Sequence, residues 1–84
     1  TLNMLGYQLM GEGKLVQART LFFVNTRLYP KSANVYDSYG EVCLKLGDKK
    51  EALAQYRRAL AMDPMNSNAA RIIADLEKEG VVAE

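Results

Sequence analysis

The chain has 84 residues, with 11 basic and 10 acidic side chains and a formal net charge of +1. This balance is too small to indicate a general nucleic-acid or membrane-surface protein, and no apolar run approaches the roughly 20 residues that a membrane-spanning helix needs. The chain contains no histidine, which removes the commonest general base and metal ligand, and its single cysteine, Cys43, excludes a disulfide within these residues.

The first half of the chain predicts two helices, because apolar side chains recur there at helical spacing. One helix is expected over residues 1–10 and ends at the Gly11-Glu12-Gly13 turn. The second is expected over residues 15–29 and stops before Pro30, because the residue that precedes a proline is pushed out of the helical region.

The second half of the chain predicts three more helices. They are expected over residues 33–46, about 49–62 and about 67–79, and a frayed tail is expected over 81–84. Ser32 and Asp48 are expected N-caps, and Gly47 suits a left-handed position after a helix end. Short connections between five helices predict an all-α fold with antiparallel neighbours.

The sequence also contains an internal repeat with a period of 34 residues. Identical residues at this offset are Gly6/Gly40, Gly13/Gly47, Ala18/Ala52, Pro30/Pro64 and Asn34/Asn68. Gly6 and Gly40 fall in the middle of helices, where glycine costs about 1 kcal/mol relative to alanine. Because this unfavourable glycine recurs at the same position of both repeats, we predict that two helices approach closely there. Ala18 and Ala52 are the expected small residues on the facing helices.

This pattern resembles the tetratricopeptide repeat. The second repeat, residues 33–66, carries Tyr36, Tyr39, Gly40, Cys43, Ala52, Tyr56, Ala59 and Pro64, and the first, residues 1–32, carries Leu2, Leu5, Gly6, Leu9, Ala18, Phe22 and Pro30. Residues 67–79 resemble the capping helix of such arrays. The resemblance implies a single solenoid domain over residues 1–80, which serves as a non-catalytic protein-interaction module or scaffold and not as an enzyme.

A narrower resemblance rests on Leu2-Asn3, Leu5-Gly6-Tyr7, Asn25, Tyr29-Pro30, residues 32–38, Gly40-Glu41 and Gly47-Asp48-Lys49. Together these segments resemble the short C-terminal repeat tails of bacterial serine hydrolases, such as esterases and β-lactamase-like proteins. That resemblance implies a fragment of a larger enzyme at a periplasmic or extracellular site. The alternative is a stand-alone or longer adaptor, which would be cytoplasmic. The hydrolase motifs G-x-S-x-G and S-x-x-K are absent, so no catalytic residue is expected.

In this family the first helix of each pair lines the concave face, where repeat solenoids usually bind their partners. The register gives the outward residues of that face as Asn3, Tyr7, Met10, Asn34, Asp37, Glu41, Lys45, Asn68, Arg71 and Asp75. Asp37 and Glu41 lie one helical turn apart and would repel a peptide carboxylate, so we expect a basic or polar peptide. The pair could hold a metal ion, but a solvated acidic face is commoner, and we predict no metal and no cofactor.

Three further expectations concern single positions. Asn25 replaces the small residue of the second repeat, Ala59, and predicts an inter-repeat hydrogen bond to residues 36–38. Cys43 lies on an apolar stripe and is expected to be a buried thiol without a redox role. The shortened first helix exposes the apolar side of Leu2, Leu5 and Leu9, which predicts a homodimer through that surface.

Overall fold

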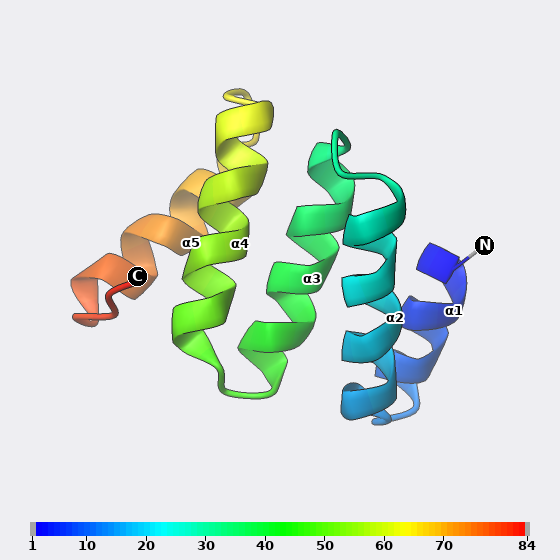
Figure 1. The fold of residues 1–84 in the computed structure, drawn as a ribbon. Helices are drawn as coiled ribbons and strands as arrows, with labels where there is room; N and C mark the ends of the chain where they lie inside the picture. The colour runs from blue at the N-terminus through cyan, green and yellow to red at the C-terminus, as the bar shows by residue number, and fades with distance from the viewer. Residues whose placement is uncertain (1, 84) are drawn as a thin grey trace.

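Residues 2–83 are described by the computed structural model, which arranges them as five α-helices in sequence (Figure 1). The helices are α1 (Leu2–Gly11), α2 (Leu15–Leu28), α3 (Ala33–Lys45), α4 (Lys49–Met62) and α5 (Ser67–Lys78). Each helix begins and ends within one or two residues of the predicted bounds, and the described residues contain no strand. The all-α prediction is therefore confirmed.

The helix ends follow the chemistry of the residues that flank them. Gly13, Gly47 and Gly80 have φ angles of 79°, 83° and 89°, in the left-handed region that glycine adopts without strain. The side chain of Asp48 caps α4 by accepting a hydrogen bond from the Glu51 amide at 3.3 Å. Ser32 occupies the N-cap position of α3 as predicted, but its side chain makes no capping hydrogen bond.

Each helix packs against the next one in the chain, and α1 also contacts α3. In Figure 1, α2 and α4 lie toward the viewer, whereas α1 and α5 lie behind them. We call the side formed by α1, α3 and α5 the α1/α3/α5 face. The opposite side is built by α2 and α4, which both rest on α3. None of these helices is long and apolar enough to cross a bilayer.

The two mid-helix glycines allow an aromatic ring to sit against the neighbouring helix. A Cβ atom on Gly6 would lie 2.7 Å from ring carbons of Phe22, and one on Gly40 would lie 3.0 Å from ring carbons of Tyr56. The predicted close approach is therefore confirmed, but each glycine meets the aromatic residue of the next helix. Ala18 and Ala52, the small residues expected at these contacts, are fully buried.

Two clusters of buried side chains form most of the core, and Tyr39 packs against both. The larger cluster includes Cys43, whose complete burial confirms that this thiol lies in the core as predicted. Val81 and Ala83 pack against the same cluster, and the Val81 amide donates to the Leu76 carbonyl at 3.0 Å. Residues 81–83 thus differ from the expected frayed tail because two of their side chains cover core surface, while residue 84 lies outside the described residues.

Candidate functional site

The centre of the α1/α3/α5 face is a set of hydrogen bonds that joins three segments. The Tyr7 hydroxyl of α1 lies 2.8 Å from the Ser38 hydroxyl of α3 and donates to the Glu41 carboxylate at 3.3 Å. The Asn66 amide, at the N-cap of α5, donates to the Asp37 carboxylate at 3.3 Å. The structure therefore brings together Tyr7, Asp37 and Glu41, three of the residues predicted for this face.

These carboxylates make the centre of the face electronegative. The pKa of Tyr7 is raised, mainly by burial and further by the nearby charges of Glu41 and Asp37, although the hydrogen bond with Ser38 opposes the shift. The pKa of the buried Tyr56 phenol is also raised, again by burial first and then by Asp37 and Glu41. Two phenols on different helices thus experience the same negative field, which favours a cationic partner.

Met10 is an exception among the predicted residues of this face. It is only 9 % exposed and packs with Ala18, Phe22 and Val42, so the prediction that it points outward is wrong. The last turn of α1 lies against α2 and α3, and the Met10 side chain fills the space between them. An edge of Met10 still lines a small hollow of about 220 Å³ beside Tyr7, Glu41 and Lys45.

The remaining predicted residues surround the centre. Asn34 and Lys45 of α3 are exposed, and so are Asn68, Arg71 and Asp75 of α5. The Arg71 guanidinium donates to the Asn68 side chain at 2.8 Å and lies 3.8 Å from the Asp75 carboxylate. Asn3 is half-buried near the start of α1. The exposed members can serve as a polar rim around Tyr7, Asp37 and Glu41.

Asn25 does not make the predicted inter-repeat hydrogen bond. Its side chain is 5 % exposed and lines a cavity of about 370 Å³ with Leu2 and Asn3 of α1 and with Tyr29. Within residues 2–83, no hydrogen bond joins the Asn25 side chain to residues 36–38, and the side chain lines this cavity together with α1. The Tyr36 hydroxyl instead donates to the Pro30 carbonyl at 2.7 Å.

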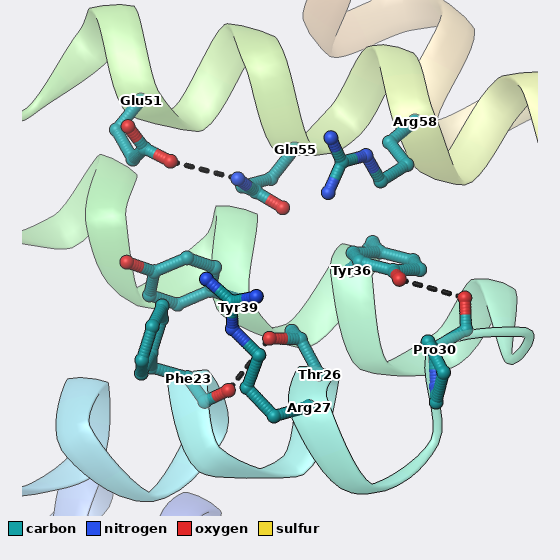
Figure 2. Close-up of a pocket in the computed structure, with 9 residues that line it drawn as sticks. All are labelled: Phe23, Thr26, Arg27, Pro30, Tyr36, Tyr39, Glu51, Gln55 and Arg58. Carbon is teal, nitrogen blue, oxygen red and sulfur yellow. Dashed lines mark hydrogen bonds between the residues drawn. The ribbon is translucent and has the colours of Figure 1, made fainter.

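A second candidate site lies on the opposite side of the molecule, and the sequence reasoning missed it. A groove of about 610 Å³ runs between α2 and α4, with α3 side chains at its floor (Figure 2). Its lining residues are Phe23, Thr26, Arg27, Pro30, Tyr36, Tyr39, Glu51, Gln55 and Arg58. We call it the α2/α4 groove. The sequence does contain the two arginines and three aromatic residues of this groove. They come together only when three helices pack, so their positions in the sequence did not reveal the site.

Aromatic rings hold both arginines of the groove. The Arg27 guanidinium lies 5.1 Å from the ring centroid of Phe23, and the Arg58 guanidinium lies 5.2 Å from that of Tyr36. Phe23 in turn meets Tyr39 edge to face, with centroids 5.8 Å apart. Neither arginine is paired with a carboxylate within residues 2–83, whereas the adjacent Arg57 lies 2.6 Å from Glu77.

Polar groups complete the α2/α4 groove. Gln55 donates through Nε2 to the Glu51 carboxylate at 2.7 Å, and Thr26 donates to the Phe23 carbonyl at 2.6 Å. Burial raises the pKa of Tyr39 to about 12, with smaller contributions from Cys43 and Glu51. The groove therefore holds neutral phenols, one carboxylate and two guanidinium groups. It can bind a ligand through charge and hydrogen bonds.

Nothing in the described part of the chain gathers three side chains that could ligate a metal ion. The Asp37 and Glu41 carboxylates accept hydrogen bonds from Asn66 and Tyr7 respectively.

Comparison with known proteins identifies one segment of the chain. Residues 33–66 match the family model of the tetratricopeptide repeat. These residues include all of α3 and α4, and therefore Asp37, Glu41 and the α4 side of the groove. A comparison with curated proteins gives no match, so the resemblance to serine hydrolase tails receives no support.

Proposed function

We propose that this chain is a protein-interaction module that holds a basic or polar peptide on its α1/α3/α5 face. The tetratricopeptide repeat at residues 33–66 supports a role in protein interaction. The observation that carries the choice of peptide is the convergence of Tyr7, Asp37 and Glu41 at the centre of this face. The same charges disfavour a peptide that ends in a carboxylate at this position.

The geometry suggests how a cationic side chain would be held. Glu41 and Asp37 are half-buried and each accepts only one side-chain hydrogen bond in the described part of the chain. An ionised carboxylate has about four acceptor sites, so both can take further donors. A peptide lysine or arginine would form charge-assisted hydrogen bonds here, which are about twice as strong as neutral ones.

Binding of a labelled lysine-rich decapeptide tests this proposal. The Asp37→Asn and Glu41→Gln double variant should weaken binding about tenfold or more, because two charge-assisted contacts are lost. The matched control is Glu77→Gln on α5, which removes a carboxylate that pairs with Arg57 and should leave the affinity within about twofold. Unchanged affinity in the double variant, or no binding of the basic peptide to the wild type, would refute the proposal.

Self-association through α1 is a separate part of the proposal. Of the three leucines predicted for this surface, Leu5 is 44 % exposed, whereas Leu2 and Leu9 are half-buried and Leu9 packs against the core. Met4 is 71 % exposed, so α1 still presents apolar side chains to solvent. Burial of such surface against a second copy would favour a dimer. Sedimentation equilibrium should then give a mass that rises with concentration, and Leu5→Glu should reduce that rise. A monomer at all concentrations would contradict the dimer and leave the peptide-binding proposal intact.

A further inference from the structure

We propose that the α2/α4 groove is a second binding site, which takes an acidic peptide segment from another protein. The groove lies on the opposite side of α3 from the α1/α3/α5 face and shares none of its charged residues. Three features of the groove indicate this ligand. The two arginines suit acidic side chains, the Gln55 amide suits the peptide backbone, and the aromatic residues suit an apolar side chain.

The arginines supply the preference for an acidic ligand. Arg57 and Arg71 lie near the carboxylates of Glu77 and Asp75, whereas Arg27 and Arg58 face aromatic rings and have no carboxylate partner within residues 2–83. A guanidinium stacked on a ring is already oriented, and its N–H edge remains available for the two oxygens of a carboxylate. The groove therefore contains two oriented guanidinium groups and one carboxylate, that of Glu51, so its net charge is positive.

Gln55 supplies the preference for a peptide over a small anion. The side chain is 9 % exposed, and its Nε2 is occupied by Glu51. Its Oε1 points toward the middle of the groove and accepts no hydrogen bond from residues 2–83 (Figure 2). This oxygen is open to a donor from outside the chain, and the backbone N–H of an extended peptide provides one. A phosphate or carboxylate ion would offer this oxygen no donor.

The spacing of residues along α4 sets which side chains of the peptide lie near Glu51 and Arg58. Glu51 and Arg58 are seven positions apart, or about 10 Å along a helix, which corresponds to roughly three residues of extended chain. The acidic side chain would therefore lie near Arg58, and a neutral residue about three positions away would lie near Glu51. At the Glu51 end of the groove, the Phe23–Tyr39 pair offers apolar surface for an aromatic or aliphatic side chain of the peptide (Figure 2).

Fluorescence anisotropy with a fluorescein-labelled decapeptide of glutamates and one central phenylalanine tests the inference. We expect saturable binding to the wild type, and at least a tenfold loss of affinity in the Arg27→Gln and Arg58→Gln double variant. The matched control is Arg71→Gln, the same charge change on the other face, which should alter the affinity less than twofold. A decapeptide with glutamine in place of glutamate should bind at least tenfold more weakly, and Glu51→Gln should strengthen acidic-peptide binding about twofold.

Several outcomes would overturn the inference. They are no saturable binding, full binding by the double variant, or a loss of acidic-peptide binding caused by Asp37→Asn and Glu41→Gln. Displacement of the peptide by millimolar inorganic phosphate would indicate that a free anion suffices. A dimer that the arginine substitutions dissolve would indicate a second copy as the occupant. Circular dichroism confirms that each variant is helical, and the single variants Arg27→Gln and Arg58→Gln give the same test if the double variant is unfolded.

Discussion

The two sides of this small helical array differ in how far their polar groups satisfy one another. On the α1/α3/α5 face, Tyr7, Asp37 and Glu41 are already joined to side chains of neighbouring helices. In the α2/α4 groove, Arg27 and Arg58 rest on aromatic rings without a carboxylate partner. The first side carries acidic charge and the second carries basic charge, although both are built on α3.

This difference gives the two sides of α3 surfaces of opposite charge, each completed by helices from both halves of the chain. Residues of α3 alternate between the two sides, so Asp37 and Glu41 belong to one face while Tyr36 and Tyr39 belong to the other. A change confined to one side should therefore leave binding at the other side intact. A change in the shared interior should instead weaken both.

The largest expected effect is a loss of stability at high pH, because the shared interior must remain uncharged. Burial, aided by the carboxylates of Glu51 and Asp48, raises the pKa of the Cys43 thiol from 9.0 to about 11. The unfolded thiol ionises from about pH 9, whereas the folded protein keeps its proton, so the contribution is present below pH 9 and is lost as pH rises toward 11. The loss amounts to about 2 kcal/mol.

Urea unfolding between pH 8 and about 11 measures this loss, and Cys43→Ala is the informative variant. It should remove the decline in stability between about pH 9 and pH 10, even though its stability at neutral pH is lower. The Tyr39 phenol, whose pKa is about 12, should retain its own decline above pH 10. A wild type with constant stability up to pH 11 would contradict a protonated interior.

A second prediction concerns the contact that holds α1 in the α1/α3/α5 face. Gly6→Ala would place a Cβ atom 2.7 Å from the buried Phe22 ring, so either the ring or α1 must shift. Overpacking costs about 1–3 kcal/mol and the better helix propensity of alanine returns about 1 kcal/mol, so the net loss of stability reaches at most about 2 kcal/mol.

Gly11→Ala is the matched control, because it changes the same helix at a position where a new Cβ atom meets no atom within 4 Å. Urea unfolding should show a loss for Gly6→Ala and none for Gly11→Ala. Binding of the basic decapeptide should weaken in Gly6→Ala because α1 supplies Tyr7. Equal stability of the two variants would mean that the contact with Phe22 does not limit the approach of α1.

The smallest expected effect concerns the arginine next to the groove. Arg57 is adjacent to Arg58 in the chain, but it pairs with Glu77 of α5 and does not line the groove. Arg57→Gln removes an exposed ion pair, so the free energy of unfolding should fall by at most about 1 kcal/mol. Acidic-peptide affinity should change less than twofold, and a larger loss would mean that general positive charge explains binding.

Much of this molecule follows from its sequence. The period of 34 residues and the turn glycines at positions 13 and 47 predicted the helices, and the repeated Gly6 and Gly40 predicted a close helix contact. The residues that differ from expectation depend on tertiary neighbours. Met10 is buried because three helices meet there, and Asn25 lies against α1 because its side chain falls within its own helix pair.

The two sites also differ in how far the sequence could predict them. Asp37 and Glu41 could be placed together from their spacing, because one helix carries both. The α2/α4 groove could not be predicted from spacing. Its residues Arg27, Tyr39 and Gln55 come from three helices, and nothing in their spacing shows that they line one cavity. Local periodicity therefore predicts a face on one helix better than a groove between several.

Chemical-shift mapping on the ¹⁵N-labelled chain tests most directly whether the two sides bind separately. Addition of the lysine-rich decapeptide should shift amide signals around Tyr7, Asp37 and Glu41, whereas the glutamate-rich decapeptide should shift those around Phe23, Arg27 and Arg58. Both peptides should bind at the same time without displacing each other. Shifts at the same residues with both peptides, or mutual displacement, would contradict two sites of opposite charge preference.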